Sequence, residues 1–453
     1  MNVSRLVRGI SAVLVALGLV TGAVSTASAE GFAISTLSAR GGAFGGGAAS
    51  GMVARADDAS AVAYNPAGLT QVPGTQFMAG LAAVALNLDL DTDAGWCSNS
   101  HQVWPIPHGY LSHQLNDKVW LGVGMFTRWG LGHSYPDGWA SSGIAQNVGM
   151  GSALKSITLL TSTINPTVAY KLNDVWSIAV GVSYTWGYLS LNNQLYGPNT
   201  TSSGLVMGDH IGDVRVHSEN GRSFGYNLAL HAKFNEQWSA GLTYRSHERM
   251  KFNGSVRVRS HGGMGLIDGN FLAANGGLYN SRGKATIVLP DVIALGVAYK
   301  PLKNLSFEAD VAYTVWSRWR ALNVDLNSEN PYSDLGINAN GIHQQKNWRD
   351  TWALSFSTEY WMYDWLALRA GILYETSPLN GEYYNDYLIP TNGRLQYSAG
   401  LGLKYNQWTL DFSYCYMQER EVNLSSNSNA GTLNGKFGNG YDHTFCLTLG
   451  YKF

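Results

Sequence analysis

The sequence has few charges, few cysteines and no long apolar run beyond its first 30 residues. Charged residues make up 13% of the 453 residues, whereas soluble domains usually carry about 25%. The net charge of −1 gives no argument for nucleic-acid binding. The cysteines, Cys97, Cys415 and Cys446, are too scattered for a disulfide scaffold or a zinc site. Nothing after residue 30 reaches the roughly 18 unbroken apolar residues of a membrane helix.

The first 29 residues have the pattern of a secretory signal peptide, 1–29. Arg5 and Arg8 form a basic start, residues 10–24 form an apolar stretch, and Ala27-Ser28-Ala29 is a typical cleavage site. The alternative is an uncleaved anchor, but the apolar run is short for a membrane span. We therefore expect an exported chain whose mature part begins at Glu30.

Aromatic residues and glycine are abundant instead. The chain has 15 Trp, 25 Tyr and 53 Gly, and its mean hydropathy is −0.10. Few charges, many aromatics and no apolar helix together favour a transmembrane β-barrel. In such a barrel apolar and polar residues alternate, so that the average hides the apolar face.

Residues 176–188 show this alternation directly. Trp176, Ile178 and every second residue up to Tyr188 are apolar, whereas the residues between them are small or polar. A period of two predicts a strand with one apolar face. A soluble β-sandwich would bury that face against a second sheet. It would not explain why short turns alternate strictly with long loops, which is typical of an outer-membrane barrel.

The pattern predicts an all-β fold, a 14-stranded antiparallel transmembrane barrel over residues 75–453. The expected strands are 75–90, 106–115, 119–132, 155–172, 175–192, 221–234, 238–258, 284–300, 305–326, 348–362, 366–378, 394–405, 408–423 and 441–453. An even number places both ends of the barrel on the periplasmic side, and closure removes the sheet edges that hydrocarbon cannot satisfy. The terminal Phe453 resembles the signal that outer-membrane assembly machinery recognises.

Residues 30–74 lack barrel alternation and are rich in glycine and alanine. A barrel of about fourteen strands is too wide to be filled by side chains alone, so we expect this segment to fold inside as a plug. Asp57 and Asp58, with Arg40 and Arg55, are candidates for ion pairs with the wall. Asn65-Pro66 predicts a rigid turn where the plug ends. The alternatives are a flexible linker or a nucleotide loop, but no βαβ unit surrounds the glycines.

The segment GFAISTLSARGGAFGGGAASGMVARADDASAVAYNPAGL resembles the N-terminal hatch of the FadL family of outer-membrane transporters for long-chain fatty acids and other hydrophobic compounds. Its most characteristic parts are Ala56–Ala59 and Asn65-Pro66-Ala67. Further similar stretches are NDKVWLGVGMFTRWGLG, GLTYRS, VAYTVWS, WRDTWALSFSTEYWMYDWLALRAGILYETSP and LIPTNGRLQYSAGLGLKY. The resemblance covers essentially the whole mature chain.

The resemblance implies a route for a hydrophobic ligand. The ligand first enters a groove among extracellular loops, for which residues 133–154 are candidates. It then reaches a pocket in the barrel, where the hatch start, Gly31 and Phe32, lies. A kink in the third strand, here Phe126, Gly130, Leu131 and Gly132, opens the wall sideways. Glycines permit such a bend, although they could also serve only to relieve curvature.

Strand parity suggests partners for a carboxylate. With Trp238, Leu242 and Tyr244 outward, Arg245 and Arg249 are expected on the lumen side. Arg318 and Arg320 are expected on the polar face of the ninth strand. Any of these cations could hold a carboxylate, or they could belong to a charge network that stabilises the wall. The resemblance does not extend to named carboxylate ligands here.

The same parity places Cys415 and Cys446 inside the barrel on the last two strands. If Trp408 is opposite Phe453, the two sulfurs are direct cross-strand neighbours. A disulfide and two free thiols both remain open at this point, since direct cross-strand disulfide geometry is often strained.

The leading functional hypothesis is passive transport of hydrophobic compounds, most of all long-chain fatty acids, across the bacterial outer membrane. The alternatives are an aromatic-hydrocarbon channel of the same family, a general porin, a structural barrel and an outer-membrane lipolytic enzyme. A plug argues against a porin or a structural barrel. No phosphate loop or recognisable nucleophile motif is present. We expect a monomeric non-enzyme without cofactor, metal or nucleic acid, whose partners are its ligand, membrane lipid and the assembly machinery.

Overall fold

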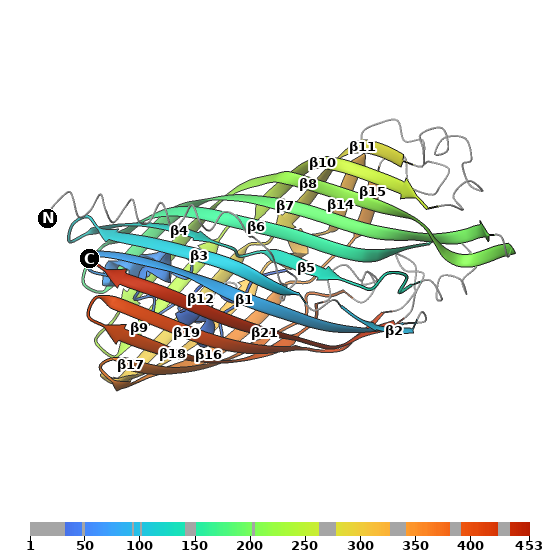
Figure 1. Cartoon of the computed structure of the whole chain (residues 1–453). Helices are drawn as coiled ribbons and strands as arrows, with labels where there is room; N and C mark the ends of the chain where they lie inside the picture. Colours follow the sequence, from blue (N-terminus) through green and yellow to red (C-terminus); the bar gives the residue numbers. More distant parts are fainter. Residues whose placement is uncertain are drawn as a thin grey trace.

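A single closed antiparallel sheet makes up most of the computed structural model (Figure 1). The structure describes residues 32–47, 50–92, 95–99, 102–140, 151–201, 204–261, 278–326, 341–380, 391–424 and 435–453. The expected signal peptide and Gly31 lie outside these residues, as do residues 141–150 of the expected loop groove. Within the described part, no helix is both long and apolar enough to cross a bilayer.

The strands run from one end of the barrel to the other and are in places interrupted. They are β1 (Thr75–Thr92), β2 (Gly95–Ser98), β3 (Val103–Gln114), β4 (Val119–Phe126), β5 (Gly130–Ser134), β6 (Gly151–Lys171), β7 (Trp176–Thr201), β8 (Gly204–Lys233), β9 (Trp238–Arg245), β10 (Glu248–Ser260), β11 (Leu278–Leu289), β12 (Val292–Leu302), β13 (Leu305–Thr314), β14 (Ala321–Leu326), β15 (Gly341–Gln345), β16 (Thr351–Tyr363), β17 (Leu366–Glu375), β18 (Arg394–Tyr405), β19 (Trp408–Glu419), β20 (Val422–Leu424) and β21 (Gly435–Lys452). Collinear pieces such as β9 and β10 count as one barrel strand, which confirms the expected total of fourteen.

The first and last strands close the cylinder. β1 pairs with β21 from Gln76 opposite Lys452 upward, and on its other edge it pairs with β3. The backbone N–H of Phe453 donates to the Thr75 carbonyl at 3.0 Å. Closure pairs the first strand with the last, which removes the two open edges that a sheet cannot expose to hydrocarbon.

The outer surface of the barrel is apolar, as the alternation predicts. On β7, Val180 and Val182 are 53% and 58% exposed, whereas Ser177 and Thr185 on the other face are buried. Exposed Trp, Tyr, Phe and Leu side chains recur in this way around the sheet. The exposed face therefore suits lipid and the inner face suits a polar lumen.

Three of the short turns use the same hydrogen bonds. The Asn173 Oδ1 accepts from the backbone N–H of Val175 and Trp176, at 2.9 and 2.8 Å. Asn116 and Asn235 accept from their own turns in the same way. Asparagine favours such turns because its side chain replaces a backbone acceptor. These turns lie at the same end of the barrel as Phe453 (Figure 1).

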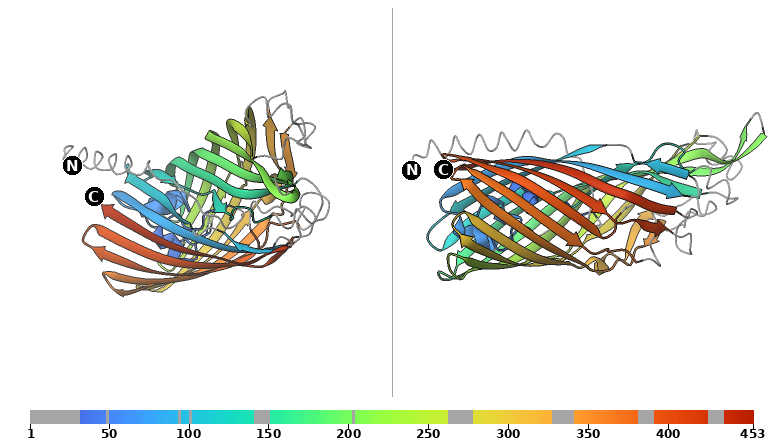
Figure 2. Two further views of the ribbon diagram at one scale, coloured as in Figure 1. Left: turned by 45° about the vertical axis from the view of Figure 1, so that its right-hand side comes forward. Right: turned by 90° about the horizontal axis from the view of Figure 1, so that it is seen from below.

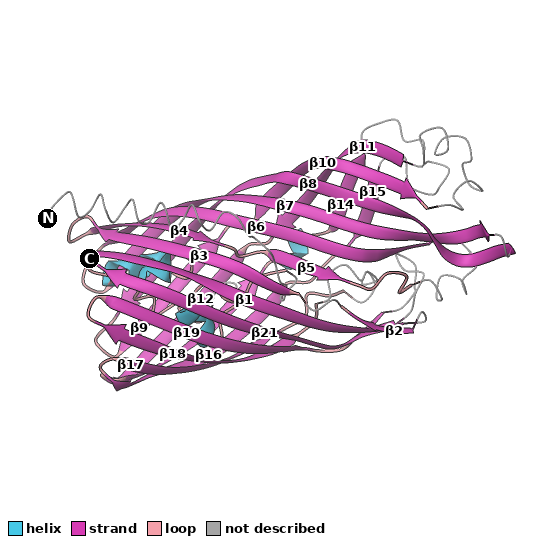
Figure 3. Cartoon of the chain, viewed as in Figure 1, coloured by secondary structure: helices cyan, strands magenta, loops and turns pink. Residues whose placement is uncertain are grey.

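The N-terminal segment lies inside the barrel near the end with the short turns (Figures 2 and 3). It contains the short helix α2 (Ala39–Ala43) and two 3-10 helices, η1 (Ala59–Val62) and η2 (Pro66–Gln71). Ser38, Asp58 and Asn65 cap them, each accepting from a backbone N–H two or three residues further on. Most of its side chains are buried, although it lies outside the sheet.

Five of the strands expected to be continuous are interrupted, and these irregularities change which side chains face inward. The interrupted strands are 119–132, 238–258, 284–300, 305–326 and 408–423. Between β9 and β10 the chain leaves the ladder at Ser246 and His247. Arg245 and Glu248 are both buried as a result, whereas Arg249 is exposed. The expected lumen side of Arg249 is therefore wrong, because an irregularity in a strand shifts the period of two.

The expected register of the last two strands is also wrong. Trp408 is opposite Tyr451 rather than Phe453, so Cys415 is opposite Thr444 and Cys446 is opposite Ser413. The cysteines are therefore diagonal neighbours, and all three cysteines of the chain are buried free thiols. The connection from β19 to β21 is long, so no tight turn sets this register. Barrel closure sets it instead.

Candidate functional site

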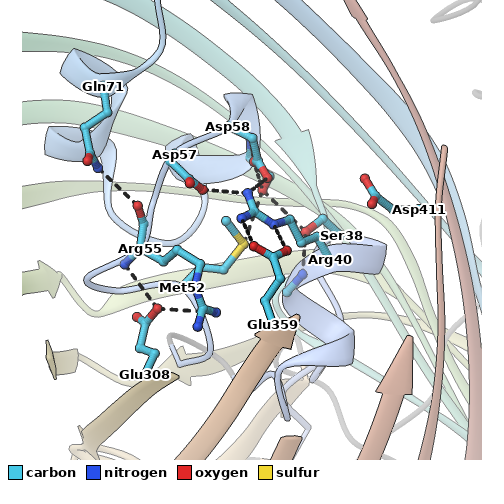
Figure 4. A network of polar contacts seen from close by, with 12 residues as sticks. Ser38, Arg40, Met52, Arg55, Asp57, Asp58, Gln71, Glu308, Glu359 and Asp411 are labelled. Carbon is cyan, nitrogen blue, oxygen red and sulfur yellow. Dashed lines mark hydrogen bonds and ion pairs between the residues drawn. The ribbon is translucent and has the colours of Figure 1, made fainter. Parts of the chain in front are cut away.

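An ion-pair network holds the N-terminal segment to the barrel wall (Figure 4). The Arg40 guanidinium contacts Asp57 at 2.5 Å, Asp58 at 3.1 Å and Glu359 on β16 at 3.0 Å. Arg369 on β17 contacts the same Glu359 at 2.7 Å and Asp411 on β19 at 2.5 Å. The network thus joins the segment to three strands.

Arg40 is buried but keeps its charge. Burial lowers the pKa of its guanidinium, and the nearby carboxylates of Asp57, Glu359 and Asp58 more than offset this, so that the pKa lies well above its ordinary value. The Arg40 Nε and one terminal nitrogen both donate to Glu359, which is the bidentate arrangement that arginine favours. Removing one partner of such a buried group leaves an uncompensated charge.

Two carboxylates of β13 bind the backbone of the segment. Glu308 accepts from the N–H of Ala54 at 2.7 Å and of Arg55 at 3.1 Å. Asp310 accepts from the N–H of Gly51 at 2.6 Å. The sequence predicts that Arg55 forms an ion pair with the wall. In the structure its guanidinium lies 3.6 Å from the carboxylate of Glu308. These bonds fix the path of the chain around residue 53.

The Asn65-Pro66-Ala67 motif is an anchor as well as a turn. Asn65 has an extended backbone, as expected before proline, and its Oδ1 accepts from the Ala67 N–H at 3.1 Å. Its Nδ2 donates to the carbonyls of Val53, at 2.7 Å, and of Leu230 on β8, at 3.2 Å. Pro66 starts η2, where a missing N–H costs nothing. The motif therefore joins two parts of the segment to the wall.

At its other end the segment begins with an aromatic cluster. The ring of Phe32 is 1% exposed and makes edge contacts with Trp129, Trp316 and Trp319, with centroids 5.7, 5.1 and 5.2 Å apart. Trp348 completes the cluster at 6.4 Å. Edge-to-face pairs of this kind are favourable beyond their buried area. The Phe32 side chain is thus held by apolar contacts.

An apolar pocket adjoins this cluster. Every side chain around it is apolar: Phe32, Leu131, Ile157, Leu159, Leu189, Leu191, Val216, Ile287, Trp319, Leu322 and Val324. The pocket encloses only about 20 Å³, close to the space of a single water molecule. A hydrophobic ligand of any size would therefore have to move a lining side chain, and Phe32 is the one that belongs to the N-terminal segment.

The third barrel strand is interrupted beside Phe32. β4 ends at Phe126 and β5 begins at Gly130. The segment forms backbone hydrogen bonds with the residues of this gap. Ala33 pairs with Trp129, and the Ile34 N–H donates to the backbone carbonyl of Arg128 at 2.7 Å. The Gly130 N–H donates to the backbone carbonyl of Phe32, also at 2.7 Å. The interruption lies within the expected kink, although the residues that leave the ladder are 127–129 rather than the glycines.

In the part of the barrel that the structure describes, the wall lacks hydrogen bonds between two adjacent strands at the same place. β3 pairs with β4 between Gly109 and Gln114, whereas β5 pairs with β6. Within the described ladders, residues 103–108 of β3 pair with β1 and have no partner on the β5 side. The N-terminal residues therefore lie against the part of the wall where two adjacent strands do not hydrogen-bond.

A second, larger cavity lies at the end with the short turns. It encloses about 710 Å³ and is bordered by charged groups of the segment and wall, including Arg40, Asp57, Asp58, Glu359 and Arg369, and by the turns near Lys171, Glu236 and Asn406. It is thus a polar space between the segment and the short turns.

The candidate carboxylate partners are not gathered in one pocket. Arg245 is buried, but its guanidinium donates to Asn165 at 3.0 Å and to the carbonyls of Val62 and Ala63 at 2.7 Å. Arg318 contacts Asp291 and is 45% exposed. Arg320 is also exposed. In the interruption between β13 and β14, the side chains that face inward are those of Trp316 and Trp319. Sequence parity missed these tryptophans, although the stretch WSRWR was a visible signal.

Three possible metal ligands meet at the far end of β8 and β10. His210, Asp213 and His261 place one donor atom each within 4.8 Å of the others. Asp213 contacts both imidazoles, at 2.9 and 2.5 Å. Sequence analysis did not predict this group, because His261 is distant in the sequence and is brought near by strand pairing.

A closed barrel with an apolar outer face and an internal N-terminal segment defines an outer-membrane β-barrel protein. Residues 20–453 match the family described as "Outer membrane protein transport protein (OMPP1/FadL/TodX)". The chain belongs to this family, which confirms the resemblance seen in the sequence. The family comprises outer-membrane transport proteins.

Curated relatives span nearly the whole chain. The long-chain fatty acid transport protein of Escherichia coli O6:H1 is 26% identical over 463 residues, covering 96% of this chain and 98% of the relative. That of Salmonella typhi is 24% identical and covers 88% and 91%.

Solved structures show the same fold. A FadL homologue of Pseudomonas aeruginosa superimposes with a TM-score of 0.73 at 20% identity, covering 93% of this chain and 99% of the other. The toluene transporter TodX of Pseudomonas putida gives 0.66 at 16% identity, with the same coverage.

Proposed function

We propose that the protein carries hydrophobic compounds passively across the outer membrane, with long-chain fatty acids as the main substrate class. The observation that carries this proposal is the position of Phe32, which borders an all-apolar pocket and is bonded to the interruption in the third strand. One residue thus touches both the place where a ligand would bind and the place where it would leave. The names of the relatives support the choice of fatty acids.

The proposed route has three steps. A ligand enters from the extracellular side and takes the place of Phe32 in the aromatic cluster, gaining about 0.8 kcal/mol for each buried CH₂. Residues 32–34 then lose their apolar contacts and their bonds to the interruption. The gap between β3 and β5 opens to the bilayer, and the ligand leaves sideways along its concentration gradient without ATP.

In this proposal residues 30–74 form a hatch of which only the start moves. The ion pairs of Arg40 and the backbone bonds to Glu308 and Asp310 are remote from the apolar pocket and do not depend on a ligand. The hatch therefore stays in the bore while residues 32–34 move, and polar solutes do not leak. Phe453 is proposed to serve assembly rather than transport.

Aromatic hydrocarbons are a second candidate substrate class. None of the residues that border the described pocket carries a charge, and the buried Arg245 already has three partners. A neutral ligand would need no counter-charge there. This observation favours a compound such as toluene over an ionised carboxylate.

Uptake of labelled oleate and labelled toluene by cells with and without the gene tests both proposals. Dependence of oleate uptake on the gene supports fatty-acid transport, and dependence of toluene uptake alone supports the second candidate. If neither depends on the gene, the proposed function is wrong. Assay of the purified protein with a chromogenic ester tests the remaining alternative, because gene-dependent ester hydrolysis would indicate a lipolytic enzyme.

A further inference from the structure

The outer face of β8 and β10 changes from apolar to basic at one level of the barrel. On β8 the outward residues Leu228, Tyr226 and Phe224 are exposed, and the next outward residue is the exposed Arg222. Arg222 lies directly opposite Trp186 on β7. At this level or beyond it, the exposed outward residues of the two strands include Lys251, Arg257 and Arg215, and the exposed Arg249 lies two residues before Lys251 on β10, near the level of Phe224. We call these four residues and Arg222 the basic patch.

The outward direction of the patch follows from its neighbours. Lys251 lies between Met250 and Phe252, which are 0% and 1% exposed and face inward. Arg257 follows Val256, which is 5% exposed. Because side chains alternate along a strand, Lys251 and Arg257 point away from the lumen. The patch therefore lies outside the barrel and takes no part in the transport route.

The patch begins at the outer edge of the lipid-facing band. The exposed aromatic side chains on β8 and the residue after it extend from Phe224 to Phe234. These two residues are ten positions apart along the chain. Ten steps extend roughly 33 Å along a strand, which at a tilt of about 40° is roughly 25 Å along the barrel axis, the usual height of the apolar band. Phe234 is at the end with the short turns, so Arg222 is at the extracellular boundary of the membrane.

Like charges in the patch face one another. Arg222 is directly opposite Lys251, and Arg215 is directly opposite Arg257. Directly opposed side chains are about 5 Å apart at Cβ, and like charges in this position are destabilising. None of the described ion pairs includes these four side chains. The exposed acid nearest in the chain, Glu219, contacts His217 at 3.2 Å.

Elsewhere on the barrel, opposite charges meet instead. Asp91 on β1 is directly opposite Lys436 on β21, and Lys436 also contacts Glu421 at 3.6 Å. Lys284 on β11 is opposite the exposed Asp325 on β14. Among the described residues, the opposed cations of the basic patch form no ion pair with a carboxylate, which distinguishes them from these pairs. An external anion would relieve their repulsion.

We propose that the basic patch binds the phosphate groups of lipopolysaccharide, the anionic glycolipid of the outer leaflet. A phosphate between two opposed cations would receive charge-assisted hydrogen bonds from both strands. The depth of the patch matches that of a headgroup, and Trp186 beside Arg222 is suited to the interface between chains and headgroups. Clusters of Lys and Arg next to an apolar membrane segment attract anionic lipid in general.

Native mass spectrometry tests this proposal. It measures the affinity of the full-length protein, in detergent micelles, for deep-rough lipopolysaccharide. The variant Arg222→Gln, Lys251→Gln, Arg257→Gln should bind about 100-fold more weakly, at about five-fold for each lost cation. The control Lys118→Gln, Lys300→Gln, Lys404→Gln removes the same charge from exposed sites at the opposite end and should bind like the unchanged protein. The charge-preserving variant Arg222→Lys, Lys251→Arg, Arg257→Lys should retain binding.

Two further arms identify the ligand group. The first arm uses lipopolysaccharide that a phosphatase has dephosphorylated. It should bind to the unchanged protein about 100-fold more weakly than intact lipopolysaccharide does, which is the loss expected for the triple variant. Millimolar inorganic phosphate should not displace the intact lipid. Equal binding of the dephosphorylated lipid, full displacement by phosphate, or unchanged binding to the triple variant would each overturn the proposal.

The folded state is checked by heat-dependent mobility in gels. If the triple variant does not fold, the single variants Arg222→Gln and Lys251→Gln take its place and should each weaken binding about five-fold. Single variants that bind like the unchanged protein would overturn the proposal as well.

Discussion

The two halves of the barrel interior hold the same N-terminal segment in different ways. In the half with the short turns, Arg40, Glu359 and Arg369 form a buried ion-pair network beside a cavity of about 710 Å³. In the other half, Phe32 packs among tryptophans beside an apolar pocket of about 20 Å³. Ion pairs require particular partners, whereas a hydrophobic ligand can replace apolar contacts at little cost. The difference indicates which part of the segment a ligand can release.

Disrupting the polar half should have the largest effect. In Arg40→Ala, Asp57 and Asp58 lose their partner and Glu359 keeps only Arg369, and loss of one partner of a buried pair usually costs about 3 kcal/mol or more. We expect the segment to leave the bore for part of the time, which is measured as increased single-channel conductance in planar bilayers. The exposed Lys300→Gln is the control. Conductance equal to that of the unchanged protein would show that the network does not hold the segment.

Locking the apolar half should block transport without opening a pore. Ala33 is directly opposite Trp129, so Ala33→Cys with Trp129→Cys places two thiols at a distance that suits a disulfide. Oxidised cells should take up substrate no faster than cells without the gene, and reductant should restore uptake to the level of Trp129→Cys alone. Full uptake by the oxidised, cross-linked protein would exclude release of residues 32–34 as a step.

Emptying the aromatic cluster should strengthen ligand binding. Phe32→Ala removes a side chain whose burial contributes about 1.5–3 kcal/mol and which a ligand would otherwise have to displace. We expect affinity for a hydrophobic ligand to rise about ten-fold, measured by quenching of tryptophan fluorescence. Phe32→Leu should give a smaller rise. Weaker binding by Phe32→Ala would mean that the ring is part of the binding surface.

The smallest effect is expected from reduction of the native protein. The Cys415 Sγ lies 3.3 Å from the Gly42 carbonyl in the polar half, and all three cysteines are free. Reductant should therefore leave the thermal unfolding temperature unchanged, and alkylation after denaturation should label all three cysteines. Protein labelled at a single cysteine would indicate a disulfide and a register other than the one described.

Most of the barrel could be predicted because its signals are local. The alternation along residues 176–188 and the short turns each depend on a few neighbouring residues, and the structure shows both. The candidate site could not be predicted from such local signals. Trp129, Trp316 and Trp348 come from three different strands or their interruptions, and only the closed barrel brings them to Phe32.

The errors in the sequence analysis have two physical origins. A period of two predicts the direction of a side chain only while the strand is continuous, and the irregularity at residues 246–247 moved Arg249 to the outer face. A strand register is local only where a tight turn joins the strands, and the long connection before β21 left Cys446 opposite Ser413. Neither irregularities nor closure is visible in an alternation pattern.

The sequence by itself determined that the chain is a barrel, how many strands it has, and which end carries the short turns. These properties follow from hydrophobic alternation and turn chemistry within about ten residues. Only the tertiary structure decided which residues meet in the bore, where the wall lacks hydrogen bonds, and which cations face one another outside. Those properties depend on how strands distant in the sequence are aligned when the cylinder closes.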